Sequence, residues 1–124
     1  MVLGRGLLES VYETVLAAKL TELGYSVVRQ KPVDIEYAGL RFESAFRIDL
    51  LVEEKLLVEI KSAERLNSAH AKQLLTYLRL TDQSLGLLIN FGGETLREGL
   101  RRVVNNHTSL CAFAPLREQK SQER

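Results

Sequence analysis

The sequence FRIDLLVEEKLLVEIK, residues 46–61, decides the fold. Two apolar runs of strand length, from Phe46 to Glu53 and from Leu56 to Ser62, flank a short charged connection that contains Glu54 and Lys55. Strand-sized apolar runs on either side of a short polar connection are typical of a β-hairpin. We therefore expect an antiparallel pair of strands at this position.

The register of this hairpin follows from matching the apolar face of one strand to that of the other. Side chains alternate between the two faces of a strand, so a slip of one residue would expose half of the apolar set. The expected pairs, all on one face of the sheet, are Ile48 with Ile60, Leu50 with Val58, and Val52 with Leu56. This register needs an odd-length connection, residues 53–55, or a compensating bulge. It also places Asp49 opposite Glu59, about 5 Å apart between β-carbons, with Lys61 two residues beyond on the same face.

The facing carboxylates of Asp49 and Glu59 suit one chemistry in particular. With the backbone carbonyl of Ile60, they offer the hard oxygen ligands that Mg²⁺ or Mn²⁺ prefers. A lysine beside such a site, here Lys61, can orient or deprotonate an attacking water, or neutralise charge that builds on a phosphate. These residues therefore predict phosphodiester hydrolysis. The alternative is a surface ladder of ion pairs, in which each pair would contribute about 0–1 kcal/mol of stability.

The rest of the chain supplies further strands and helices around this hairpin. The predicted elements are a helix over Leu7–Leu23, a strand over Ser26–Arg29, two short strands within Val33–Glu43 hinged at Ala38-Gly39, a helix over Asn67–Leu80 capped by Asn67 or Ser68, a buried strand over Leu85–Asn90, and a helix from about Glu94 to Asn105. Apolar residues with a period near 3.6 mark the helices, and short runs rich in β-forming residues mark the strands. Pro32 suits an edge strand. This order predicts an α/β (α+β) fold with one mixed sheet flanked by helices.

Length and composition bound the class of protein. A chain of 124 residues with 45% hydrophobic and 27% charged residues is typical of one globular domain, which we place at residues 1–114, with a disordered tail at residues 115–124. The net charge of +1 argues against nucleic-acid binding by bulk electrostatics alone, so such binding would need a local basic patch. We find neither a membrane span nor a signal peptide and expect a cytoplasmic protein. Cys111 is the only cysteine, which excludes an internal disulfide and predicts a small buried side chain.

Polar side chains on two predicted helices extend the candidate site. Gln73 and Tyr77 are four residues apart, so they project from one face of their helix, away from its apolar stripe. Their alternative role is packing on the helix surface. Glu9 lies near the start of the first helix, where a carboxylate also interacts favourably with the helix N-terminus.

Several blocks of the sequence together resemble the GxxExxY protein family, a group assigned to the PD-(D/E)XK nuclease superfamily. In the order of the family, the blocks are GLLESVY at 6–12, RIDLLV at 47–52, VEIK at 58–61, QLLTYL at 73–78 and LGLLINFG at 85–92. The resemblance extends over roughly residues 3–104. Two features depart from the family pattern. The family's first helix usually begins further upstream, and no proline precedes Asp49 where the superfamily name has one.

The resemblance implies a restriction-endonuclease-like core and a metal-dependent nuclease, with Mg²⁺ or Mn²⁺ as cofactor and nucleic acid, DNA in particular, as substrate. The roles carried over are Asp49 and Glu59 as metal ligands, Lys61 as the catalytic lysine, Glu9 as a further acidic residue at the metal, and Gln73 with Tyr77 as the Q-x3-Y pair of RecB-type members. The competing class is a non-catalytic nucleic-acid-binding or protein-interaction module that retains the nuclease fold. Because the chain is small, a homodimer or a partner protein would complete a binding groove.

Overall fold

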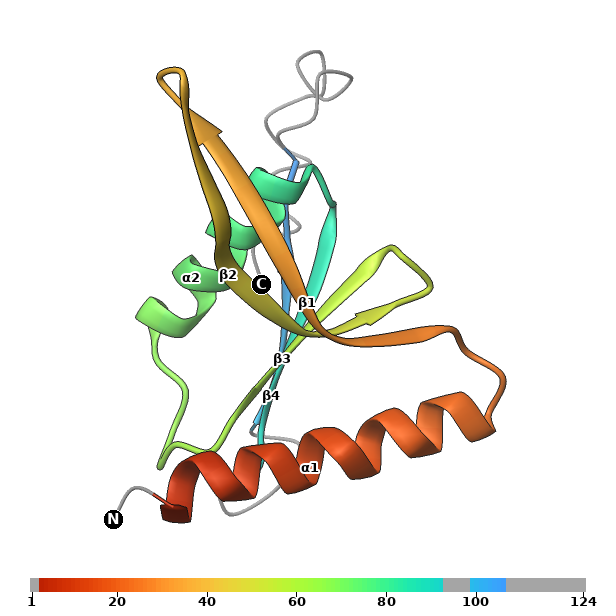
Figure 1. Ribbon diagram of the computed structural model, residues 1–124. Coiled ribbons are helices and arrows are strands. Elements are labelled where there is room, and N and C mark those ends of the chain that lie inside the picture. The colour runs from red at the N-terminus through yellow and green to blue at the C-terminus, as the bar shows by residue number, and fades with distance from the viewer. Residues whose placement is uncertain (1–2, 93–98, 107–124) are drawn as a thin grey trace.

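The computed structural model describes residues 3–92 and 99–106, which form a mixed five-stranded sheet with two helices (Figure 1). In chain order the elements are α1 (Leu3–Glu22), β1 (Val27–Tyr37), β2 (Leu40–Val52), β3 (Leu56–Lys61), α2 (Ser68–Thr81), β4 (Leu85–Asn90) and β5 (Leu100–Val104). The strands lie side by side in this same order, with β3 and β4 parallel and the other neighbours antiparallel. The predicted mixed sheet with flanking helices is confirmed. Neither helix of the described residues is long and apolar enough to span a membrane.

Strands β1 and β2 form one long hairpin that projects away from the rest of the sheet (Figure 1). Its turn lies at Ala38-Gly39, where the sequence predicts a hinge, and both residues have positive φ angles of 54° and 80°. Two left-handed residues make the tight turn whose twist matches that of antiparallel strands. The two short strands predicted on either side of this hinge are longer than expected: the first is continuous with the strand predicted at Ser26–Arg29, and the second with the strand predicted from Phe46. Pro32 lies in β1, an edge strand, as expected.

The hairpin of β2 and β3 has the predicted register as far as Leu50 and Val58, where the pairing ends, so the third expected pair, Ile48 with Ile60, does not form. Leu50 pairs with Val58, and Val52 pairs with Leu56. The connection consists of residues 53–55, whose first two members have φ angles of 56° and 57°, and the N–H of the third donates to the Val52 carbonyl at 3.0 Å. The three-residue connection is confirmed, because an even number of residues would have turned one apolar face outward.

The core consists of two apolar clusters, one under each helix. The α2 cluster, under helix α2, consists of the buried residues Ile48, Leu51, Leu57, Leu74, Leu78, Leu88 and Val103. The α1 cluster, under helix α1, consists of the buried residues Ala17, Leu50, Val52, Val58, Ile60 and Ile89. Adjacent residues of β3, Leu57 and Val58, belong to different clusters, so the two helices cover opposite faces of the sheet.

Ile48 lies on the face opposite to the one that the sequence predicts. It packs in the α2 cluster with Leu51, whereas its expected companion Leu50 packs in the α1 cluster. Regular alternation would put residues 48 and 50 on the same face. The alternation breaks at Asp49, the residue between them, which lies across from Gln30 of β1; Gln30 has a φ angle of 51° and is skipped between the pairs formed by Arg29 and Lys31.

The predicted helix from Glu94 to Asn105 is wrong over its second half. Residues 100–104 form β5, which pairs antiparallel with β4 from Leu85–Val104 to Ile89–Leu100. The β-branched Val103 favours a strand, and the edge of β4 presents N–H and C=O groups with which a further strand can pair. Residues 94–98, the expected tail and Cys111 lie outside the described residues.

Candidate active site

Asp49 and Glu59 lie where β2 and β3 separate. The backbone pairing of the two strands ends at Leu50 and Val58. Beyond these residues, side-chain carboxylates accept the hydrogen bonds that backbone carbonyls accept in a regular sheet. The backbone N–H of Asp49 donates to Glu59 Oε1 at 3.2 Å, and the N–H of Ile60 donates to Asp49 Oδ2 at 2.8 Å. Each strand therefore holds the acidic side chain of the other. The predicted opposition of Asp49 and Glu59 is present in the structure.

Burial gives this carboxylate pair unusual proton affinity. Glu59 is only 5% exposed, and Asp49 is half-buried. Burial, followed by the nearby charge of Asp49, raises the pKa of Glu59 to about 8. Burial, and to a lesser degree the charge of Glu13, also raises the pKa of Asp49. Loss of hydration and like charge both disfavour the ionised form, so the pair favours binding either a proton or a metal cation.

Lys61 extends from the end of β3 toward α2. Its Nζ donates to Gln73 Oε1 at 3.1 Å, so the amide of Gln73 holds the ammonium group beside the carboxylate pair. The N-cap of α2 fixes this helix: the Asn67 side chain accepts hydrogen bonds from the N–H groups of Ala69 and His70. The helix thus presents Gln73 to the lysine, a contact that the sequence does not predict.

Tyr77 lies one turn further along the same helix. Its ring stacks on Phe46 of β2, with ring centroids 4.0 Å apart and planes 6° apart. Burial, followed by the charges of Glu59 and Asp49, raises the pKa of Tyr77. The hydroxyl therefore stays protonated at neutral pH and is available as a hydrogen-bond donor near the acidic pair.

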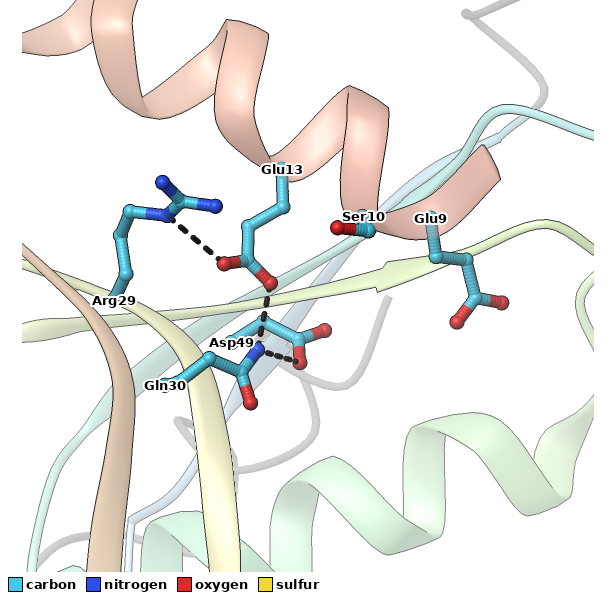
Figure 2. Close-up of a pocket in the computed structure, with 6 residues that line it drawn as sticks. All are labelled: Glu9, Ser10, Glu13, Arg29, Gln30 and Asp49. Carbon is cyan, nitrogen blue, oxygen red and sulfur yellow. Dashed lines mark hydrogen bonds and ion pairs between the residues drawn. The ribbon is translucent and has the colours of Figure 1, made fainter. Parts of the chain in front are cut away.

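Glu9 approaches the site from α1 but does not bond to the carboxylate pair. Its Oε2 accepts a hydrogen bond from the N–H of Ser62 at 3.0 Å. Glu9 and Asp49 line one pocket of about 350 Å³, and Figure 2 shows Glu9 at its edge, apart from the hydrogen-bonded side chains. Across the described residues, no three acidic, histidine or cysteine side chains are already assembled to hold a metal ion.

Four residues of this pocket were not predicted from the sequence: Ser10, Glu13, Arg29 and Gln30. Glu13 is 6% exposed, forms an ion pair with Arg29 at 3.0 Å and accepts a hydrogen bond from Gln30 at 2.6 Å. A signal for Glu13 was present, because it is a charged residue four positions after Glu9, on the side of α1 that faces the sheet. Arg29 and Gln30 gave no such signal, since their position depends on the irregular backbone of β1.

The loop after Lys61 is fixed by a buried amide of β4. Asn90, 2% exposed, accepts a hydrogen bond from the N–H of Ala63 and donates to its carbonyl, each at 2.9 Å. Next to it, Phe91 stacks on Tyr12 of α1 with ring centroids 4.1 Å apart. These contacts join α1, the loop after Lys61 and β4 around the site.

Comparison with known proteins agrees with this geometry. Residues 1–103 match the family model described as the PD-(D/E)XK nuclease superfamily. The chain belongs to this superfamily. The superfamily assignment and the restriction-endonuclease-like fold predicted from the sequence are confirmed. Membership in the GxxExxY family within it stays a prediction.

A solved structure of similar fold is described as "Crystal structure of SSO0001". The two chains are 18% identical and superpose with a TM-score of 0.61. The match covers 96% of this chain and 63% of the other, so this chain spans less than two thirds of that protein. At this identity the similarity concerns the fold alone. No curated protein matches the sequence.

The acidic pair of this PD-(D/E)XK domain fits a divalent metal ion. Asp49 and Glu59 supply carboxylate oxygens, the ligand type that Mg²⁺ and Mn²⁺ prefer. Among the described residues, no lysine, arginine or histidine forms an ion pair with either carboxylate. The nearby charge of Lys61 lowers the pKa of both carboxyls, but burial outweighs it and both pKa values stay raised, so full ionisation of the pair needs further positive charge.

Proposed function

We propose that this chain is a metal-dependent nuclease that hydrolyses phosphodiester bonds of nucleic acid, with DNA as the substrate. The observation that carries the proposal is the carboxylate pair, which is held by cross-strand hydrogen bonds and forms no ion pair with the described residues. Membership of the PD-(D/E)XK nuclease superfamily supports a nuclease-like function for such a pair.

Asp49 and Glu59 would hold the metal ion, Mg²⁺ or Mn²⁺. The carboxylate of Glu9 and the carbonyl of Ile60 are further ligands in this proposal. Glu9 lines the same pocket as Asp49, which supports its inclusion. When bound, the ion would lower the pKa of a bound water and polarise the phosphate.

Lys61 and Tyr77 would act on the substrate side of the pair. The ammonium group of Lys61, held by Gln73, can orient a water or offset negative charge that develops on the phosphate. The protonated hydroxyl of Tyr77 can donate to a phosphate oxygen, because its raised pKa keeps its proton in place. Gln73 would act through Lys61, as a positioning residue.

A cleavage assay with purified protein tests this proposal. With Mg²⁺ or Mn²⁺ present, we expect cleavage of end-labelled single- or double-stranded DNA, and none with a chelator. Glu59→Ala and Lys61→Ala should each lower the rate by at least about a hundredfold, the usual range for groups that transfer protons or stabilise charge. Lys72→Ala, which removes an exposed lysine of α2, serves as the matched control and should leave the rate unchanged.

Two results would contradict the assignment. Full activity in both Glu59→Ala and Lys61→Ala would place the reaction elsewhere or reveal a contaminating enzyme. Tight DNA binding that is indifferent to metal, without cleavage, would instead identify a binding module that retains the nuclease fold.

A further inference from the structure

Gln30 joins two carboxylates on different elements. Its Nε2 donates to Glu13 Oε1 of α1 at 2.6 Å and to Asp49 Oδ1 of β2 at 3.3 Å (Figure 2). An amide nitrogen carries two hydrogens, so one glutamine can serve both acceptors at once. A neutral donor therefore lies between two acids that would otherwise repel each other.

The backbone of β1 brings Gln30 to this position. Its φ angle of 51° is left-handed, which is uncommon for a residue other than glycine. It falls between the pairs Arg29–Leu50 and Lys31–Ile48, which places it across from Asp49. Left-handed residues of this kind carry strain and persist only where the surrounding structure holds them, often at functional sites.

The carboxylate of Asp49 is consequently held at both oxygens. Oδ1 accepts from Gln30, and Oδ2 accepts from the N–H of Ile60 at 2.8 Å. A carboxylate oxygen can accept more than one bond, so these contacts fix the group and leave each oxygen able to bind a further ligand. Glu13 in turn is held by Arg29, whose Nε donates to Oε2 at 3.0 Å and offsets its charge.

We propose that Glu13 and Gln30 form a positioning pair, in which Glu13 holds the Gln30 amide so that this amide orients Asp49 toward a divalent cation. The pair rests on the proposed function in one respect: it takes Asp49 as a cation ligand. It adds two residues on α1 and β1, and it assigns a role to the irregular backbone of β1.

Calorimetric titration with Mn²⁺ alone measures the effect of the pair without any need for cleavage. Gln30→Gly removes the amide, and glycine adopts the positive φ angle freely, so the strand should keep its path. We expect its Mn²⁺ affinity to fall about tenfold, as when a metal ligand loses an outer hydrogen-bond partner. Glu13→Ala should lower the affinity by a similar factor. The double variant should lose no more than either single variant, because both act through one contact.

Two controls separate positioning from charge. Glu13→Gln keeps an oxygen that can accept from Gln30 and should retain most of the wild-type affinity. Glu22→Gln removes an exposed charge of the same helix, paired with Lys19 at 3.4 Å, and should change nothing. Thermal unfolding of each variant verifies that the fold is intact.

The proposal is overturned if Gln30→Gly binds Mn²⁺ like the wild type. An equal loss of Mn²⁺ affinity in Glu13→Gln and Glu13→Ala would also overturn it, since Glu13 would then act through its charge alone. A wild-type protein that does not bind Mn²⁺ would overturn it as well. A different result would contradict only the nuclease function: Mn²⁺ binding that depends on Gln30, with no cleavage of DNA. That outcome would still support the positioning pair.

Discussion

The raised pKa of Glu59 predicts that the metal-free protein loses stability as the pH rises. In the unfolded chain Glu59 ionises near its ordinary value of 4.5, whereas in the folded protein it keeps its proton up to about pH 8. Between these values the folded state binds the additional proton, so raising the pH lowers the free energy of unfolding. The stabilising contribution of the protonated group is complete below pH 4.5 and is lost as the pH passes through about 8.

The size of the effect follows from the same two values. A tenfold change in proton affinity corresponds to about 1.4 kcal/mol, so the pKa rise of Glu59 from 4.5 to about 8 corresponds to at most about 5 kcal/mol of stability. Glu59→Gln removes the ionisable group and keeps an oxygen that can accept from the N–H of Asp49. We expect this variant to lose most of the dependence on pH and to be more stable than the wild type at pH 8. Because the pKa of Asp49 is also raised, the free energy of unfolding of this variant should still fall with pH, but less steeply.

Urea unfolding at pH 5, 6, 7 and 8 in the presence of a chelator measures this dependence. Glu36→Gln, which removes an exposed carboxylate of the β1–β2 hairpin, is the matched control and should retain the wild-type slope. Added Mn²⁺ should restore stability at pH 8 in the wild type but less in Glu59→Gln, because a cation that binds only the folded state stabilises it by mass action. A wild-type stability that stays level or rises from pH 5 to 8 would refute the reasoning.

Three further substitutions test the supports of the site. Gln73→Ala frees the ammonium group of Lys61 and should lower the cleavage rate by about tenfold. Calorimetry should find the Mn²⁺ affinity unchanged. A parallel loss of affinity would contradict the role of Gln73 as a support for the lysine alone. Asn90→Ala leaves buried backbone groups without partners and should cost about 1–3 kcal/mol in urea unfolding, and a neutral result would show that water replaces the amide. Leu74→Ala, at a fully buried position, should cost about 2–5 kcal/mol, whereas Leu80→Ala, 46% exposed, should cost under about 0.5 kcal/mol; similar losses would contradict the assigned core.

Regular parts of the fold could be predicted from the sequence because local periodicity controls them. The apolar faces of the β2–β3 hairpin determine its register, and this register brings Asp49 and Glu59 together. The length and capping of α2 follow equally from its apolar stripe and from Asn67. In each case residues close together in the sequence determine the structure, so the periodicity of a short segment is enough to predict it.

Other parts depended on contacts that the sequence does not show. The last segment has apolar spacing that suits a helix, but residues 100–104 pair with the edge of β4 instead. The partners of Asp49 depend on Gln30, whose left-handed backbone no periodicity indicates. The face of Ile48 could not be predicted either, because the alternation of side chains along β2 breaks at Asp49, across from the left-handed Gln30.

The end of the β2–β3 pairing at Leu50 and Val58 explains how the acidic pair can exist. In an unbroken ladder the N–H groups of β2 and β3 would be satisfied by backbone carbonyls, and no donor would remain for side chains. Because the strands separate beyond Leu50, the N–H groups of Asp49 and Ile60 become available, and each binds the carboxylate of the facing strand. The bond from the N–H of Asp49 partly offsets the cost of placing Glu59 inside the protein, since hydrogen bonds to a carboxylate favour its ionised form. This bond does not cancel that cost, because the pKa of Glu59 remains near 8. A bound cation would supply the positive charge that favours the ionised form of Glu59 at neutral pH.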